Sequence, residues 1–504
     1  LTAFPLRRLR ASAHFMTPQP LRKFADKLLK ASLGFWGTSE QASPRLQAFL
    51  VIRQLALTQP AGFLDKCLRG VYKSFLANSK FVNAASAPHI AFMATCIVEL
   101  WGLDVQASYA HAFGAIRQLA VSLRGALNMK TQDAYKEMYS WQGVNALELW
   151  ARVLGAHAGQ PALRPLVHPL MQVLLGTARL VPTPRFFPLR LRLLRATGRL
   201  AVATQLAVPL AAPLLEMLNW AELHKPPKGG AGPVPDLLLQ LRAGKNVLRT
   251  SGFQEEVVTQ VLELLADHLA QWACHPALPE LSHLAALQLR RFAKTTRVDK
   301  FRKAAKGLLD ALDRNVAWVG AARDRADFAP RDVARTATFL AEESAAGKAP
   351  LQVYAAQLAV KAAQRAATRS TESVQIKGTK SRGRDEDSDG EEGEAGGADS
   401  SDDDEKSARA ATASAKRQQQ AKVQKPVKTS VLGLEDDGAE DEVALYEMSE
   451  DEDLPPIISL PKAAAPGDDS EDEESEDEEM EGEDSGSEDG DEDEDMSGSG
   501  GEEE

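Results

Sequence analysis

The stretch YAHAFGAIRQLAVSLRGAL, Tyr109 to Leu127, sets the pattern that runs through most of the chain. Its apolar residues recur at steps of four, three, four, three and four, at Tyr109, Phe113, Ile116, Ala120, Leu123 and Leu127. Because an α-helix completes a turn in about 3.6 residues, this spacing puts one apolar stripe on one helix. The segment therefore predicts an amphipathic α-helix that packs through a single face.

The same periodicity continues on both sides of this segment. One stripe consists of Val144, Leu147, Trp150, Val153 and Leu154, and another of Val258, Val261, Leu262, Leu265, Leu269 and Trp272. Residues 90–101 are apolar on most positions and predict a buried helix. Prolines fall between these segments, where they end helices because proline lacks the amide donor. Sustained alternation of the kind typical of strands is scarce, so we expect an all-α protein.

Many helices joined by short turns favour a HEAT/armadillo-like α-solenoid. No clear repeat consensus is visible at a period of about 40 residues, so a compact helical bundle stays open as the alternative. We expect a poorly ordered N-terminal segment at 1–20 and a helical-repeat scaffold at 21–370. The Gly- and Pro-rich loop at 225–235 is the candidate point of division of that scaffold. Residues 371–504 are expected to form a disordered charged tail, acidic with basic clusters at 377–384 and 406–428.

Charge divides the chain into two parts of opposite sign. Residues 1–376 hold 47 Lys and Arg against 25 Asp and Glu, whereas residues 377–504 hold 12 against 46, which together give the net charge of −12. All Trp and Phe residues lie before residue 377, and Tyr446 is the one aromatic residue after it. A segment so charged and so poor in large apolar residues cannot offset the entropy cost of ordering.

Catalytic motifs are not visible in the sequence. The three cysteines, Cys67, Cys96 and Cys274, are far apart, so neither a disulfide framework nor a metal site is expected. The glycines of the 225–235 loop are not followed by Lys and a hydroxyl residue, as a phosphate-binding loop requires. No HExxH motif and no uncharged run long enough for a membrane span occur. We therefore expect neither enzymatic activity, nor a cofactor, nor a membrane partner.

An arginine-rich window lies between residues 151 and 200, which hold eight Arg and no Asp, Glu or Lys. A helix that starts at Pro188 would place three of these arginines in a ridge beside an apolar face. Such a ridge suits a phosphate backbone or an acidic protein surface. The alternative is that these arginines pair with carboxylates of other helices or are simply solvated. The candidate RNA- or partner-binding residues in this window are Arg179, Arg185, Arg190, Arg192, Arg195 and Arg199.

A second basic stretch runs from residue 290 to 306 and is expected to be an exposed helix or turn. Its single acid is Asp299. The same two readings apply to its candidate binding residues, Arg290, Arg291, Lys294, Arg297, Lys300, Arg302 and Lys303. The Trp and Phe residues, by contrast, lie within the apolar stripes and are interpreted as core residues rather than base-stacking platforms.

The C-terminal tail carries serines that are followed by acidic residues, a setting that acid-directed kinases favour. The phosphorylation candidates are Ser388, Ser401, Ser449, Ser470, Ser475 and Ser487. The tail could bind basic partners such as histones or ribosomal proteins, or screen the basic body against indiscriminate RNA contact. A solubilising tail without a specific partner is the third possibility.

Three stretches resemble the nucleolar complex protein 2 family, which assists assembly of the large ribosomal subunit. They are the opening stretch at 109–127, SWQGVNALELWARVL at 140–154 and PLVHPLMQVLLGTARLVPTPRFFPLRLRLLRA at 165–196. The third is the most specific, and the match extends from about residue 23 to residue 367. The family's charged tail is matched only in character. Arg179, Arg185 and Arg190 match the family's signature.

The resemblance implies a HEAT-like scaffold without enzymatic activity, in the nucleus and nucleolus. It also implies a place in early pre-60S particles with pre-rRNA and ribosomal proteins, and a heterodimer with a sister nucleolar complex protein. The chain begins with Leu1 rather than Met, so it could be a piece of a longer protein. Two other functions stay open on the sequence: a chromatin adaptor that binds histones through the acidic tail, and an enzyme whose site is assembled from dispersed residues.

Overall fold

The computed structural model describes residues 3–16, 21–60, 62–230, 234–329 and 331–382, all of which belong to one compact unit. No strand occurs in these ranges, which confirms the all-α class. The tail from 383 onward, expected to be disordered, lies outside the described residues. Among the helices described, none is both long and apolar enough to span a membrane.

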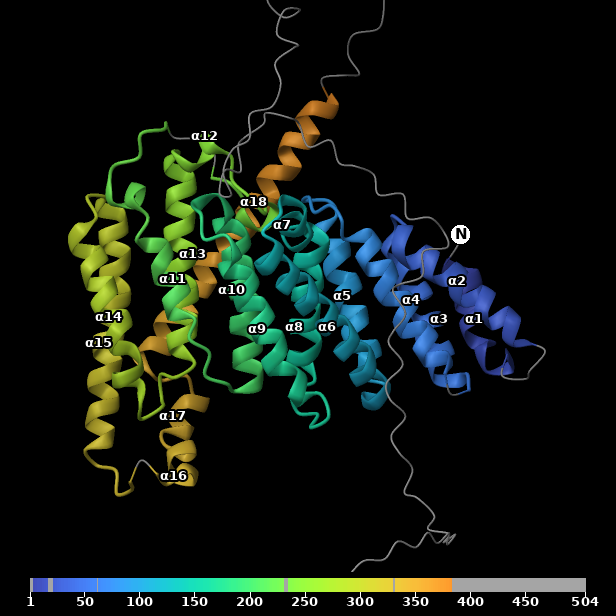
Figure 1. Cartoon of the computed structure of the whole chain (residues 1–504), viewed down its shortest axis with the longest axis horizontal. Helices are drawn as coiled ribbons and strands as arrows, with labels where there is room; N and C mark the ends of the chain where they lie inside the picture. Colours follow the sequence, from blue (N-terminus) through green and yellow to red (C-terminus); the bar gives the residue numbers. More distant parts are fainter. Residues whose placement is uncertain (1–2, 17–20, 61, 231–233, 330, 383–504) are drawn as a thin grey trace, which may run out of the picture. The chain divides into compact units, whose positions relative to one another are not determined.

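The helices follow one another in a row from the N-terminal to the C-terminal part of the described chain (Figure 1), which confirms the expected solenoid arrangement. The first group is α1 (Ala3–Ala11), η1 (Ala13–Met16), α2 (Arg22–Thr38), α3 (Ala42–Thr58), α4 (Phe63–Asn78), α5 (Ala87–Trp101), α6 (Val105–Met129), α7 (Gln132–Met138) and α8 (Trp141–Ala156). The second group is η3 (Arg164–Leu166), α9 (Val167–Leu180), η4 (Pro184–Phe186), α10 (Phe187–Thr204), α11 (Ala211–Leu218), η5 (Ala221–His224), η6 (Leu237–Leu239), α12 (Lys245–Leu248) and α13 (Ser251–Ala270). The last group is α14 (Leu278–Thr295), α15 (Asp299–Arg323), α16 (Val333–Thr338), α17 (Ala341–Ala345) and α18 (Pro350–Arg382).

Helix starts follow the local chemistry of the sequence. The side chain of Ser140 caps α8 by accepting a hydrogen bond from the amide of Gly143 at 3.0 Å, and Asp104 caps α6 in the same way. Pro188 lies in the first turn of α10, where its missing amide proton costs nothing, as the sequence predicted. At the N-terminus, within the 1–20 segment expected to be poorly ordered, the structure has α1 and η1.

The core joins neighbouring helices through large side chains. Trp101 of α5 meets Trp150 of α8 edge-on, with ring centroids 5.7 Å apart, and both are fully buried. The indole N–H of Trp150 donates to the hydroxyl of Tyr72 on α4 at 3.3 Å. Such aromatic contacts add to the free energy of burial. The apolar stripe expected on α8 is buried as predicted.

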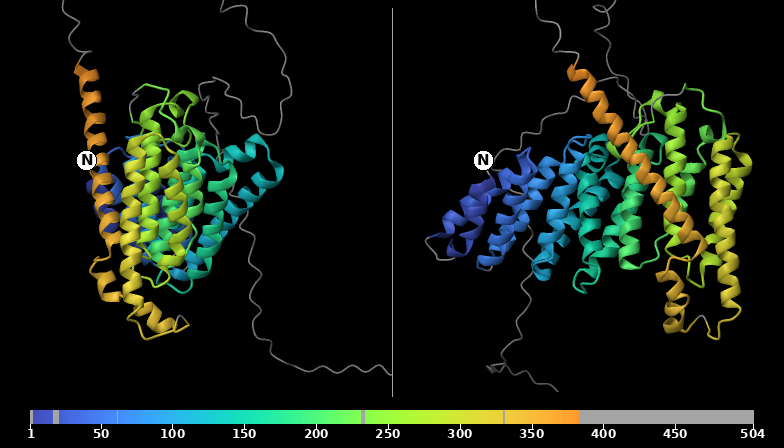
Figure 2. Two further views of the ribbon diagram at one scale, coloured as in Figure 1. Left: turned by 90° about the vertical axis from the view of Figure 1, so that its left-hand side faces the viewer. Right: turned by 180° about the vertical axis from the view of Figure 1, so that it is seen from behind.

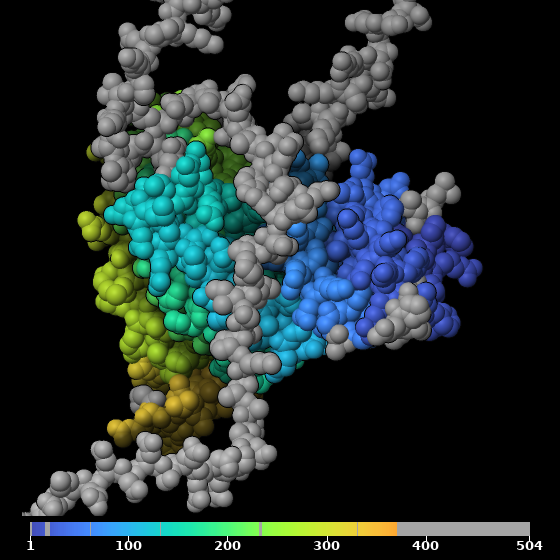
Figure 3. All heavy atoms as spheres, turned by 45° about the vertical axis from the view of Figure 1, so that its right-hand side comes forward, coloured from blue at the N-terminus to red at the C-terminus, as the bar shows by residue number. Residues whose placement is uncertain are grey.

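The stripe expected on α6 is partly wrong. Phe113 and Leu127 are 40% and 51% exposed. The helix packs instead through small and aliphatic residues on an adjacent face, at Ala112, Ile116, Leu123 and Ala126. The reason is that α6 carries no acidic residue and is apolar on more than one side, so periodicity alone did not select the buried face. The C-terminal end of α6 and α7 project from the array (Figures 2 and 3).

Helix α18 breaks the sequential order of packing. It packs against α13 and α15, which precede it by many residues, and runs obliquely across the array in the rear view of Figure 2. The helix continues to Arg382, twelve residues beyond the expected end of the scaffold at residue 370. The C-terminal helix thus packs on two earlier helices, α13 and α15, that also contact each other.

Candidate partner-binding and RNA-binding surfaces

Arg190 on α10 is buried at 1% exposure and donates to a carboxylate oxygen of Glu216 on α11 at 2.8 Å. Its guanidinium also lies over the ring of Phe187, 5.9 Å from the centroid. A buried guanidinium needs such a partner because desolvation of an unpaired charge is costly. Arg190 therefore connects α10 to α11 inside the fold.

Arg192 is held by Glu148 of α8 through two parallel hydrogen bonds of 2.7 and 2.8 Å. The same guanidinium donates to Asn145 at 3.0 Å and to the carbonyl of Leu238 at 2.8 Å. It also lies 5.1 Å from the ring centroid of Trp141. This bidentate geometry is the strongest form of arginine–carboxylate pairing.

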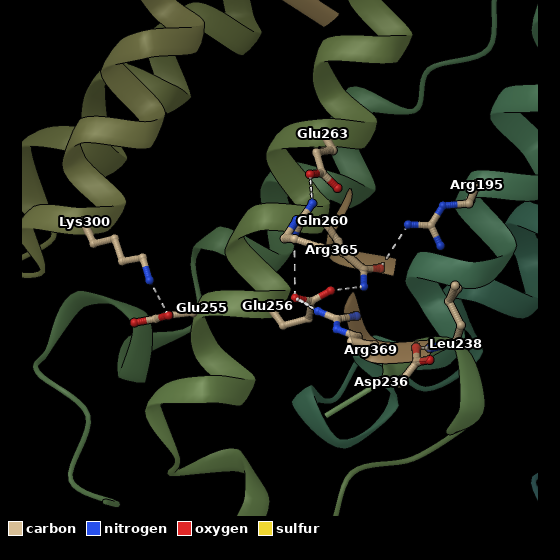
Figure 4. Close-up of polar contacts among 10 residues, drawn as sticks. All are labelled: Arg195, Asp236, Leu238, Glu255, Glu256, Gln260, Glu263, Lys300, Arg365 and Arg369. Carbon is tan, nitrogen blue, oxygen red and sulfur yellow. Dashed lines mark hydrogen bonds and ion pairs between the residues drawn. The ribbon is translucent and has the colours of Figure 1, made fainter. Parts of the chain in front are cut away.

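Arg195 points toward α13 rather than to solvent (Figure 4). It donates to the side-chain oxygen of Gln260 at 3.0 Å, and Gln260 in turn donates to Glu256 at 2.7 Å. The carboxylate of Glu256 is only 5% exposed and also accepts from Arg369 of α18 at 2.5 Å. Arg365 of α18 completes the group by bonding Glu263. A charged network thus joins α10, α13 and α18.

Burial shifts the pKa values in this network. It raises the pKa of the Glu263 carboxyl to about 7, although Arg365 acts in the opposite direction. It also raises the pKa of Asp267, one turn further along α13. The pKa of Arg195 is lowered by burial and by the neighbouring charge of Arg199. Desolvation of the charged forms outweighs their attraction for one another here.

The remaining arginines of the window differ in exposure. Arg179 and Arg199 are exposed, and so are Arg152 and Arg164, whereas Arg185 is half-buried beside the start of α10. The expected ridge of Arg192, Arg195 and Arg199 is therefore not one continuous exposed surface. Pairing with carboxylates of other helices, which the sequence left open, describes Arg190 and Arg192. A binding role for the exposed arginines stays a prediction.

The second basic stretch lies at the junction between α14 and α15, as an exposed helix end and turn. Three of its cations are paired: Arg290 with Asp313 at 2.7 Å, Lys300 with Glu255 at 2.5 Å and Arg302 with Asp299 at 2.7 Å. The other candidates are exposed and have no ion-pair partner among the described residues, and they are Arg291, Lys294, Arg297 and Lys303.

An apolar groove lies between α11, α13 and α14, with a volume of about 340 Å³. Leu281 and Leu284 line it and are strongly exposed. Trp272, Leu215 and His268 line it as well, and burial lowers the pKa of His268 to about 4. Exposed apolar residues that line a concave surface are typical of protein-binding sites. The sequence reasoning missed this groove because it forms from three separate segments.

The acidic face of α13 was missed as well. Glu256, Gln260, Glu263 and Asp267 recur at steps of four, three and four, so they share one helix face. That spacing was a visible signal for a charged seam within an otherwise apolar helix. The phosphorylation candidates of the tail lie outside the described residues. In the ranges that the structure describes, no three metal-ligating side chains gather.

The described residues define an α-solenoid protein. A family model described as the Noc2p family matches residues 62–358, so the chain belongs to that family. Nucleolar complex-associated protein 2 of Arabidopsis thaliana is 42% identical over 367 residues, which are 72% of this chain and 47% of that protein. Nucleolar complex protein 2 of Drosophila melanogaster is 32% identical over 337 residues, 66% of this chain and 44% of that protein. The chain spans about half the length of these relatives.

A further relative in Arabidopsis thaliana, Protein REBELOTE, is 29% identical over 354 residues, 70% of this chain and 59% of that protein. The family model covers the helices from α4 to the first part of α18, which include both basic stretches and the α10 and α13 residues of the charged network. The family resemblance stated from sequence is thereby confirmed. The names of the relatives also confirm the expected nuclear and nucleolar location.

Proposed function

We propose that the chain is a non-catalytic scaffold of early pre-60S particles that binds pre-rRNA and a sister nucleolar complex protein. The observation that carries this proposal is membership of the Noc2p family over most of the helical array. An α-solenoid presents a long surface with room for several partners at once. The exposed cations of the α14–α15 junction support contact with RNA, since phosphate neutralisation dominates the affinity of such contacts.

The apolar groove between α11, α13 and α14 supports the protein half of this function. Protein interfaces are centred on apolar residues that fill pockets. We assign the groove to an apolar helix of the sister protein, with Leu281 and Leu284 as its contact wall. Replacing Leu284→Arg is expected to abolish recovery of the sister protein when the chain is purified. The matched control is Leu57→Arg, an exposed leucine on α3 that lies outside the groove.

The function as a whole is tested by sedimentation of the tagged full chain from nuclear extracts. We expect it to migrate with large-subunit precursor particles and to recover their pre-rRNA after crosslinking. Recovery of free protein alone would contradict the proposal. Recovery of histones in place of pre-rRNA, abolished by deleting the acidic tail, would establish the chromatin adaptor instead. The serines of the tail remain the proposed phosphorylation sites, to be read by mass spectrometry of the same material.

A further inference from the structure

Three segments that are far apart in sequence meet at one end of the α10–α15 part of the array. The amide of Arg297 donates to the carbonyl of His224 at 3.1 Å, and the hydroxyl of Thr296 donates to that of Leu223 at 3.0 Å. On the other side, the amide of Gly229 donates to the carbonyl of Arg249 at 2.9 Å. The chain after η5 is thus fastened both to the α14–α15 junction and to the start of α13, at the top of Figure 1.

The position of Gly229 explains how close this approach is. A Cβ atom there would lie 2.7 Å from the carbonyl oxygen of Arg249, which belongs to the backbone and cannot swing away. Only glycine fits such a backbone contact without a shift of the chain. The contact holds the segment 224–229 against α13.

This arrangement collects exposed cations from all three segments. We call them the basic end, and they are Lys225, Lys228, Arg249, Arg291, Lys294 and Arg297. None of them has an ion-pair partner among the described residues. Of the neighbouring acids, Glu255 and Asp299 are already paired with Lys300 and Arg302, and Glu222 of η5 is one further acid beside the six cations. The basic end therefore keeps an excess of positive charge.

Backbone dipoles of both signs meet at this end of the array. Helices α13 and α15, of 20 and 25 residues, both begin at this end of the array. The N-terminus of a helix carries a partial positive charge of about half an elementary charge. Helix α14 ends at the same junction, at Thr295, so the partial negative charge of its C-terminus offsets part of this contribution, and the cationic side chains supply the attraction for anions.

The surface has the composition of a phosphate-binding site rather than of a protein interface. The described segments 221–230, 241–250 and 288–306 expose no large apolar side chain, and Leu238 and Leu287 at their borders are 43% and 47% exposed. A stable protein interface would need an apolar or aromatic centre. Recognition of single-stranded RNA would need aromatic residues on which unpaired bases can stack, and Phe292 of this region is buried. What remains is contact with a regular phosphate backbone.

We propose that the basic end binds the phosphate backbone of double-helical RNA without reading its base sequence. This inference rests on the proposed function and names the form of RNA that the scaffold takes. The cations of three segments meet the phosphates of the duplex, and release of condensed counterions drives the association.

The test is binding of the purified full chain to a fluorescein-labelled RNA duplex two helical turns long, followed by anisotropy at increasing KCl. The variant replaces Arg291→Glu, Lys294→Glu and Arg297→Glu together. The matched control replaces Lys30→Glu, Arg69→Glu and Lys73→Glu, exposed cations on α2 and α4 that have no ion-pair partner among the described residues. Circular dichroism verifies that each variant is folded. If the Glu variant is not folded, a second variant with Gln at the same three positions is used in its place.

We expect the control to bind as the parent chain does and the basic-end variant to lose at least about tenfold in affinity. The slope of log K against log salt should fall by roughly two to three, since each lost duplex contact removes about 0.9. Equal binding by variant and control would overturn the inference. So would a preference of the parent chain for single-stranded RNA of the same length, or for polyglutamate over the duplex.

The result of the duplex-binding test can be distinguished from the result of the sedimentation test of the proposed function. If the parent chain sediments with pre-rRNA but the basic-end variant binds duplex as the control does, only the inference fails. If duplex binding depends on the basic end but the chain never sediments with large-subunit precursors, the proposed function fails and the inference stands.

Discussion

At the scale of single residues, an arginine side chain can either bind a partner molecule or stabilise the fold. The groups within hydrogen-bond distance of its guanidinium determine which of the two it does. Arg192 has Glu148, Asn145 and the carbonyl of Leu238 within hydrogen-bond distance, so its donors are already engaged. Arg199, two turns further along α10 and exposed, has no hydrogen bond from its side chain among the described residues. Two arginines of one window therefore have different roles, although the sequence shows them as equivalent.

Replacing Arg192→Ala should lower the free energy of unfolding by about 3–5 kcal/mol, because it leaves the largely buried carboxylate of Glu148 without its partner. Urea denaturation of the purified chain measures this change. The control Arg199→Ala should stay within about 0.5 kcal/mol of the parent chain. Equal unfolding free energies for the two variants would show that the Arg192–Glu148 pair does not hold α8 to α10.

The raised pKa of Glu263 predicts that the free energy of unfolding depends on pH. Its pKa is about 7 in the fold, against an ordinary value of 4.5, because burial penalises the charged form. Between these two pH values the unfolded chain releases a proton that the folded chain retains. The contribution of this group to stability is therefore fully present below about pH 4.5 and is lost as the pH rises to about 7.

In the variant Glu263→Gln, this loss of stability with rising pH should be absent. The change in unfolding free energy between pH 4.5 and pH 7.5 should differ between variant and parent by up to about 3 kcal/mol, from the size of the pKa shift. Urea titrations at the two pH values measure it. Glu255→Gln, on the same helix but paired with Lys300 at the surface, serves as the control. A variant whose stability follows pH as the parent's does would contradict the assignment.

At the scale of elements, α18 is the part of the array that depends most on charge. Its arginines Arg365 and Arg369 meet Glu256 and Glu263 of α13 (Figure 4), while Gln260 links the same network to α10. Apolar packing through Leu351 and Ala355 fixes the first turns of α18, where both residues are buried. The later turns are held by ion pairs, so the two halves of the helix should differ in stability.

Replacing Arg365→Ala and Arg369→Ala together should loosen the second half of α18. We expect amide hydrogen exchange in residues 362–369 and in the first turns of α13 to accelerate at least about tenfold, which corresponds to 1.4 kcal/mol. Exchange in α2 to α5 should not change. Lys361→Ala on the same helix, an exposed position, is the control. Uniform acceleration across the array would instead indicate global destabilisation.

How far the sequence predicts this fold depends on how one-sided each helix is. In α8 the apolar residues are confined enough that Val144, Leu147 and Trp150 were correctly placed in the core. In α6 the absence of any acidic residue left two possible faces, and Phe113 proved to be exposed. Apolar periodicity predicts that a segment is helical. Which face of the helix is buried depends on the segments that pack against it, and these lie elsewhere in the sequence.

The same limit applies to the candidate sites. The arginine window was defined by the lack of acids nearby in sequence, yet Glu148 is 44 residues from Arg192, and Gln260 is 65 residues from Arg195. The groove and the basic end likewise form from segments that only the tertiary fold brings together. The α14–α15 junction was predicted as exposed because its charges lie close to one another along the chain.

At the scale of the whole molecule, the two charged parts of the chain oppose each other. Residues 1–382 hold 50 Lys and Arg against 25 Asp and Glu, and residues 383–504 hold 9 against 46. The two parts carry +25 and −37, which sum to the net charge of −12. A covalently attached polyanion has a high effective concentration near every basic surface of the same chain. We therefore expect it to compete with RNA for the basic end.

Deleting residues 383–504 should tighten binding of the RNA duplex by at least about tenfold at low salt, because the intramolecular competitor is removed. The gain should shrink as the salt concentration rises, since screening shortens the range of both attractions. Anisotropy titrations of the two chains across a salt series measure this. A full-length chain in which the acids of residues 468–504 are replaced by their amides separates charge from length, and it should gain affinity as the deletion does. If the deletion weakens duplex binding instead, the tail contributes to RNA contact and does not act as a competitor of RNA.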